Sequence, residues 1–129
     1  MDGSVTTWWP WKPKERLGSY AVIGAGRFGG AVCSELLRAG AEVLVIDISQ
    51  RAIDALRQLD PALEARVVDC TDEEALRASG ALDVDTVVVA ISEPLEASIT
   101  ATLIVKDSQG SRVRQVIARA TSDLHEKML

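Results

Sequence analysis

Aromatic residues, cysteine and histidine are scarce in this 129-residue chain, which has three tryptophans, one tyrosine, one phenylalanine, two cysteines and one histidine. Cys33 and Cys70 lack metal-ligand spacing, which argues against a zinc site or a disulfide framework. We interpret both as reduced thiols of a cytosolic protein. The histidine, His125, is more typical of a packing or surface residue, and no Ser/His/Asp or Cys/His signature accompanies it. The sequence therefore predicts neither a catalytic centre nor a metal site.

Positive charge is also in deficit, since the formal net charge is −5 and the isoelectric point is about 4.8. Nucleic acid and anionic lipid both require a basic footprint, so the expected partners are small molecules or proteins. No apolar run approaches the roughly 20 residues that cross a bilayer, and the N-terminus lacks a signal-peptide pattern. Hydrophobic residues make up 47% and charged residues 26% of the chain. This composition and length predict one soluble, globular domain.

Residues 1–18 differ from the rest of the chain. They contain the run Trp8-Trp9-Pro10-Trp11, followed by Pro13 and a charged stretch. Three tryptophans in such a segment indicate either a docking contact or residues added to the native protein, and the sequence leaves both readings open. We expect residues 1–18 to be an extension and residues 19–129 to be the folded domain.

From Ser19 onward, short β-branched runs alternate with segments of helical period, which is typical of βα units around a parallel sheet. Val84 to Ile91 is the most apolar run and the expected central strand, Ser49 is the expected cap of the second helix, and Thr71 with Glu74 predicts a capping box. The expected strands are 20–23, 42–46, 66–69, 84–91 and 112–118. The expected helices are 27–39, 50–59, 72–79 and 94–108, with a last one beginning at Ser122 or Asp123. The predicted fold is α/β: a Rossmann-like, doubly wound parallel sheet with helices on both faces.

A glycine motif follows the first expected strand directly and opens the first expected helix. It reads Gly24-Ala25-Gly26-Arg27-Phe28-Gly29, a G-x-G-x-x-G pattern. Gly24 permits the tight turn, Gly26 lets a phosphate approach the backbone, and Gly29 lets the helix pack close to the strand. The free N–H groups and the positive end of the helix dipole would then bind phosphate. This arrangement predicts a nucleotide site.

An acidic residue, Asp47, ends the second expected strand. It lies 47 − 29 = 18 positions beyond the last motif glycine, close to the spacing at which a carboxylate accepts hydrogen bonds from ribose hydroxyls. Because such a carboxylate repels a 2′-phosphate, an adenosine nucleotide or NAD is favoured over NADP. The alternative is a chance turn with a solvated acid at the end of a strand.

Further candidate ligand residues lie at the same predicted edge of the sheet. Arg27 could fold over a diphosphate or triphosphate, or simply face solvent. Asp69 could accept from the adenine amino group, with Cys70 and Thr71 beside it, although Thr71 is also explained as a helix cap. Arg51 could stack on adenine, or be an ordinary exposed helix arginine. Ala90 and Ile91 are expected to supply backbone and apolar wall to the cleft, and Phe28 and Ile48 complete the set of candidate binding residues.

Together these residues resemble the N-terminal domain of the RCK family, also called TrkA-N or KTN, and most closely the Ktr-type regulatory subunits. The resemblance covers Ser19 to Leu129 and rests on Gly26-Arg27-Phe28-Gly29-Gly30, the Glu96-Ala97-Ser98 helix start and the segment Ile117 to Ala120. It implies Rossmann lobes that dimerise and form octameric rings on the cytosolic face of a membrane potassium transporter. Family members continue into a further strand, a crossover helix and a C-terminal lobe, so the resemblance implies a sheet truncated before its sixth strand in this chain.

The resemblance also implies a role. ATP, ADP or NAD(H) would bind Gly26, Arg27 and Gly29 through phosphates, Asp47 through ribose, and Asp69 to Thr71 on the adenine side. Binding would change the shape of the ring and so the activity of the pore, which makes the chain a cytoplasmic, membrane-peripheral switch and not an enzyme. The alternative is the nucleotide-binding fragment of an NAD-dependent oxidoreductase whose catalytic domain lies elsewhere. A third reading is a scaffold whose tryptophan extension binds a partner.

Overall fold

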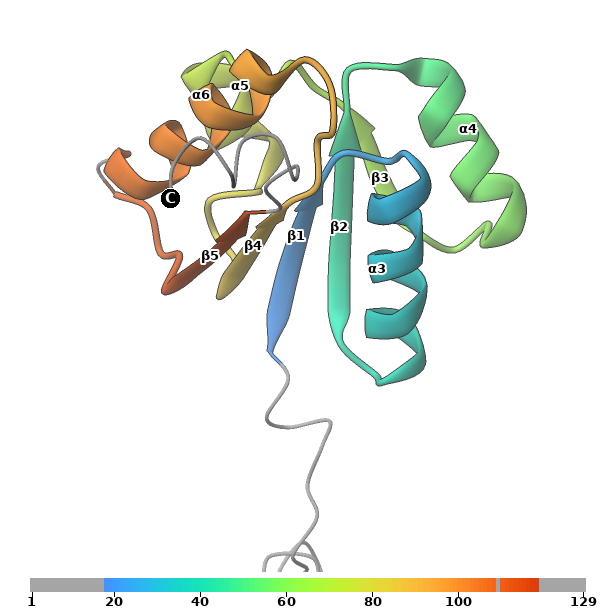
Figure 1. The fold of residues 1–129 in the computed structure, drawn as a ribbon. Coiled ribbons are helices and arrows are strands. Elements are labelled where there is room, and N and C mark those ends of the chain that lie inside the picture. Colours follow the sequence, from blue (N-terminus) through green and yellow to red (C-terminus); the bar gives the residue numbers. More distant parts are fainter. Residues whose placement is uncertain (1–17, 109, 119–129) are drawn as a thin grey trace, which may run out of the picture.

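Strands and helices alternate along the part of the chain that the computed structural model describes, residues 18–108 and 110–118 (Figure 1). The expected last helix at Ser122 or Asp123 lies outside these residues. The strands are β1 (Ser19–Ile23), β2 (Glu42–Asp47), β3 (Glu64–Val67), β4 (Thr86–Val89) and β5 (Gln115–Ala118). The helices are α3 (Arg27–Arg38), α4 (Gln50–Leu59), α5 (Glu73–Ser79) and α6 (Leu95–Asp107).

All five strands form one parallel sheet in the order β3-β2-β1-β4-β5. The chain winds outward from β1 to β3 and then crosses back to β4, on the other side of β1. The doubly wound α/β fold is therefore confirmed. β1, not the expected β4, is the middle strand, while β4 lies between β1 and β5. The point where the strand order reverses is between β1 and β4, which is where ligands bind in such sheets.

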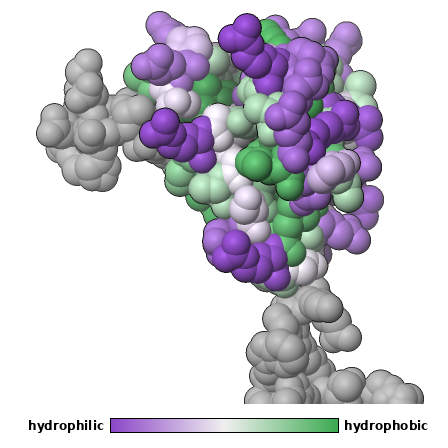
Figure 2. All heavy atoms as spheres, turned by 90° about the vertical axis from the view of Figure 1, so that its right-hand side faces the viewer, coloured by the Kyte–Doolittle hydropathy of each residue, from purple (hydrophilic) through white to green (hydrophobic). Residues whose placement is uncertain are grey.

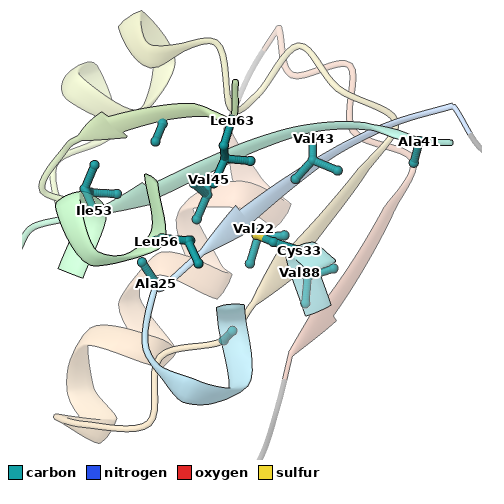
Figure 3. Packing of buried hydrophobic residues seen from close by; sticks show 12 residues of the cluster. Val22, Ala25, Cys33, Ala41, Val43, Val45, Ile53, Leu56, Leu63 and Val88 are labelled. Atoms are coloured by element: carbon teal, nitrogen blue, oxygen red, sulfur yellow. The ribbon is translucent and has the colours of Figure 1, made fainter. Parts of the chain in front are cut away.

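Helices cover both faces of the sheet, with α3 and α4 on one side and α5 and α6 on the other (Figure 1). Alternation along the strands separates the two cores, so that Val22 of β1 faces α3 while Ala21 and Ile23 face the opposite layer. Figure 3 shows the α3–α4 core, with Cys33 of α3 among the strand valines. Cys33 is 1% exposed, as expected for a small buried hydrophobe.

Three expected strands have different bounds in the structure. β3 spans Glu64–Val67, not 66–69, β4 spans Thr86–Val89, not 84–91, and β5 spans Gln115–Ala118, not 112–118. Pairing decides these bounds, because β3 pairs with β2 over Leu44 to Asp47 only, and β4 pairs with β5 over Thr86 to Val89 only. Pro94 is the residue before the first turn of α6, not a member of that turn. Its fixed φ suits this position as well as the first turn, which explains the one-residue difference.

The predicted capping box at Thr71 is wrong. Asp72 is the N-cap of α5, and its Oδ1 accepts hydrogen bonds from the backbone N–H groups of Glu74 (3.0 Å) and Ala75 (3.3 Å). Thr71 instead donates its N–H and its hydroxyl to the Asp69 carboxylate. By contrast, the predicted Ser49 cap of α4 is confirmed, since Ser49 Oγ accepts from the N–H of Ala52 at 3.1 Å.

Candidate functional site

The carboxyl edge of the sheet contains a cleft of about 460 Å³, within the range of small-molecule pockets. It lies at the reversal point, because its walls come from the residues that follow β1, β2, β3 and β4. Ten of the residues that line it are Gly24, Gly26, Asp47, Ile48, Asp69, Cys70, Thr71, Ala90, Ile91 and Glu93. The fold thus brings together most of the predicted site residues from four separate strand ends.

The three motif glycines meet different surroundings. Gly24 has a φ of +114°, and a Cβ there would lie 2.9 Å from the carbonyl carbon and oxygen of Ala90. Gly29 is packed on the carbonyl group of Gly24, with no room for a Cβ. A Cβ on Gly26 would meet no protein atom within 4 Å. Gly24 and Gly29 are therefore required by packing, whereas Gly26 leaves open space beside the cleft.

The start of α3 offers backbone donors without a cap. Gly26 is the N-cap residue, no side chain caps the helix, and its first turn contains no acidic residue. Among the residues that the structure describes, no acceptor is bonded to the N–H groups of Gly26 and Arg27. Helix geometry leaves such first-turn donors without internal partners, and the helix dipole adds positive potential there. This end of α3 is suited to an anion.

The Asp47 carboxylate connects the glycine loop with the start of α4. Its Oδ2 accepts from the N–H of Ala25 at 2.7 Å, and its Oδ1 accepts from the N–H of Ser49 at 2.8 Å. The N–H of Ala25 is therefore occupied by protein, unlike those of the next two residues. A carboxylate has about four lone-pair sites, so each oxygen can still accept another hydrogen bond. Asp47 is held in place at the cleft wall and retains capacity for two hydroxyl donors.

Asp69 is oriented by its neighbour Thr71. One oxygen, Oδ1, accepts both from the Thr71 hydroxyl (2.6 Å) and from the Thr71 N–H (3.0 Å). These two bonds, the hydroxyl bond foremost, lower the pKa of Asp69 from its ordinary value. At neutral pH the exposed side chain is an anion that can accept hydrogen bonds from a ligand in the cleft.

Cys70 lines the cleft as a neutral thiol. Burial, together with the negative charge of the adjacent Asp69, raises the pKa of Cys70 to about 11. Because the thiolate is the reactive form of cysteine, this environment suppresses nucleophilic reactivity. The Cys70 thiol can pack against a ligand but is not activated.

Alkylation of Cys70 by iodoacetamide at pH 8 is expected to be roughly two orders of magnitude slower than that of a free cysteine, whose pKa is about 8.5. The rate should rise with pH and reach about half of its maximum near pH 11, where half of the thiol is ionised. Peptide mass spectrometry after timed quenching measures the rate, and Cys70→Ser is the control, since the buried Cys33 should not react. Rapid labelling of Cys70 at neutral pH would contradict the assignment.

Two predicted residues, Arg27 and Arg51, lie outside the cleft. Both line a neighbouring groove of about 570 Å³ between α3 and α4, together with Gly26, Ser49 and Leu59. Figure 2, viewed from this side, shows apolar surface between hydrophilic ridges. Gly26 lines both hollows, so they adjoin at the residue that precedes Arg27. The structure does not bring Arg51 to the cleft wall where adenine stacking was expected.

The two apolar candidates differ in position. Ile48 lines the cleft with 66% of its surface exposed, so it can pack against a ligand at the mouth. Phe28, 39% exposed in the first turn of α3, is not among the cleft residues. Five residues that line the cleft were not predicted: Ile23, Ser92, Glu93, Pro94 and Ala97. Ile23 ends β1 and the other four follow β4. Their signal was this position, because the chain reaches the carboxyl edge of the sheet where an interior strand ends.

Neither a membrane span nor a metal site is found in the described part of the chain. No helix within residues 18–108 and 110–118 is long and apolar enough to cross a bilayer. Over the same residues, no group of three or more His, Cys, Asp or Glu side chains is arranged to hold a metal ion.

The fold and the loop geometry define a Rossmann-type α/β domain, and comparison with known proteins narrows the class. Residues 20–129 match the TrkA-N domain family. The chain is 40% identical over 110 residues to the Ktr system potassium uptake protein C of Bacillus subtilis, which covers 85% of this chain and 48% of the relative. The chain belongs to the TrkA-N domain family. It spans about half the length of the curated relatives it matches.

Solved structures show the same fold. The NAD(P)-binding domain of an exopolyphosphatase-related protein from Archaeoglobus fulgidus has a TM-score of 0.64 at 22% identity, over 84% of this chain and 92% of that one. The Shewanella denitrificans Kef CTD in AMP-bound form has a TM-score of 0.63 at 26% identity, over 79% of this chain and 58% of that one. The predicted family and fold are confirmed.

Proposed function

We propose that this domain is the adenine-nucleotide sensor of a cytosolic regulatory subunit of a Trk/Ktr-type potassium transporter. The family membership and the likeness to a Ktr potassium uptake protein support the transport role. The observation that carries the nucleotide assignment is the start of α3. There the N–H groups of Gly26 and Arg27 have no acceptor among the described residues, a Cβ on Gly26 would meet no protein atom within 4 Å, and the Asp47 carboxylate binds the adjacent N–H of Ala25.

The residues present fit an adenine nucleotide. The phosphates would lie against the N–H groups of Gly26 and Arg27, in the space that a Cβ on Gly26 would fill. The ribose hydroxyls would donate to the free lone pairs of Asp47, and the adenine amino group to Asp69. The related Kef CTD was solved with AMP, which supports an adenosine ligand. The oxidoreductase alternative is supported only by the fold that this domain shares with such enzymes.

The proposed mechanism is a population shift. A nucleotide that binds one conformation of an assembly more tightly than another changes the balance between them by its difference in affinity. In this proposal the domain works as part of a homo-oligomer, with a dimer as the unit of an octameric ring that contacts the membrane transporter subunit. Ligand contacts that connect the glycine loop, Asp47 and the ends of β3 and β4 would transmit the change.

Isothermal titration calorimetry of the 129-residue chain with ATP, ADP, AMP and NADH tests the proposal. We expect saturable binding of at least one of them below millimolar concentration, and weaker binding of NADPH than of NADH because its 2′-phosphate would approach Asp47. GTP, which has guanine in place of adenine, is the control for recognition of the base. Absence of binding by all four adenine ligands at millimolar concentration would reject the assignment.

A further inference from the structure

The amino-terminal edge of the sheet, opposite the nucleotide cleft, contains a further hollow of about 520 Å³, here called the basal hollow. It arises from strand register. β1 pairs with β2 from Glu42 onward, but β3 pairs with β2 only from Leu44, so the first two residues of β2 extend beyond β3. The larger apolar residues that line the hollow are Tyr20, Leu37, Val43, Leu44, Leu63 and Val84, and Ala41 and Ala62 line it as well.

The rim of the basal hollow is acidic. Glu42, Asp60 and Glu64 line it, against one arginine, Arg66, which is already 3.7 Å from the Glu64 carboxylate. A partner suited to this surface therefore has large apolar side chains accompanied by positive charge. Aromatic side chains with a polar atom are well suited to such half-open apolar sites.

The chain itself contains such a partner. Residues 8–11, Trp8-Trp9-Pro10-Trp11, are followed by Lys12, Lys14 and Arg16 with only Glu15 as an acid among residues 12–16. These residues lie outside the described ones. Ser19 both lines the hollow and begins β1. Trp11 is 19 − 11 = 8 residues away, a reach of up to about 29 Å for extended chain. A short tether of this kind gives a high effective concentration.

We propose that the tryptophan segment of residues 8–11 binds the basal hollow of its own chain, with its indole rings on the apolar lining and the following basic residues at the acidic rim. The segment is then a fixed part of the domain surface. It covers apolar surface that would otherwise be open to solvent at the end of the sheet remote from the nucleotide cleft. The proposal rests on the basal hollow and on the composition of residues 8–16, and it does not depend on the proposed function.

Intrinsic fluorescence of the full 129-residue chain tests this directly, because its three tryptophans all lie in the segment. Bound indoles should emit at shorter wavelength than tryptophan in water and be shielded from acrylamide. Ala62→Lys places a positive charge at an exposed position of the hollow and should shift the emission to longer wavelength, with stronger quenching. Ala55→Lys is the matched control at an exposed position in the α3–α4 groove, and should change neither reading.

Circular dichroism and the thermal midpoint establish that both variants fold, since both positions are exposed. Emission that is independent of protein concentration supports binding within one chain, whereas blue-shifted emission that is lost on dilution would show docking on a second copy and overturn the proposal. Water-like emission from the unmodified chain, or release by Ala55→Lys but not by Ala62→Lys, would also overturn it.

Discussion

Gly26→Ala is expected to weaken adenine-nucleotide binding at least about tenfold, which corresponds to about 1.4 kcal/mol, while the domain remains folded. The backbone φ of Gly26 is −77°, which any residue adopts, and a Cβ there meets no protein atom within 4 Å. The added methyl group therefore projects into the space proposed for phosphate, not into the protein. Loss of the N-cap glycine should cost less than about 1 kcal/mol of stability.

Gly29→Ala, three positions along the same motif, is the matched comparison. Its Cβ would collide with the carbonyl group of Gly24, so α3 must move away from β1. The expected cost is about 1–3 kcal/mol or more in the free energy of unfolding, as for other overpacked sites. Urea denaturation measures stability and calorimetry measures binding for both variants. If Gly26→Ala bound nucleotide as tightly as the unmodified chain, phosphate would not lie over Gly26.

The part of the site that could be predicted was the part built from residues close together in the sequence. The glycine loop follows β1 and opens α3 within a single stretch of chain, so its turn, its packing glycines and its free donors follow from local rules. The end of β2 at Asp47 was predictable from the apolar run before it. The expected meeting of Asp47 with the loop required only that β1 and β2 be parallel neighbours, which βα units specify.

Competing local interactions explain the errors. Thr71 and Asp72 are both good N-caps, and the choice was decided by Asp69, whose carboxylate takes both donors of Thr71. The position of Arg51 depends on how α4 packs on the sheet, which its sequence neighbours do not specify. The predicted range of β3 was displaced by two residues, because an edge strand with three of its four residues exposed has a weak apolar pattern.

Asp47→Ala is expected to weaken nucleotide binding at least about tenfold, since it deletes acceptors for charge-assisted hydrogen bonds worth roughly 1.5–3 kcal/mol each. It should also destabilise the free domain, because the N–H groups of Ala25 and Ser49 would lose their acceptor. Relative affinity for NADPH over NADH should rise, as the charge that repels the 2′-phosphate is gone. Calorimetry with both cofactors and urea denaturation measure these effects.

Asparagine substitutions at Asp47 and Asp69 test whether each carboxylate stabilises the free domain. Asp47 uses both oxygens as acceptors for different N–H groups, so in Asp47→Asn the amide NH₂ must face one donor, and stability should fall by about 1–3 kcal/mol. Asp69 uses only Oδ1 in its bonds with Thr71, and the asparagine oxygen can replace that acceptor without its charge, so Asp69→Asn should lower stability less than Asp47→Asn does. Equal stability of the two variants would mean that Asp47 does not fix the glycine loop, and its place at the ribose would lose its structural basis.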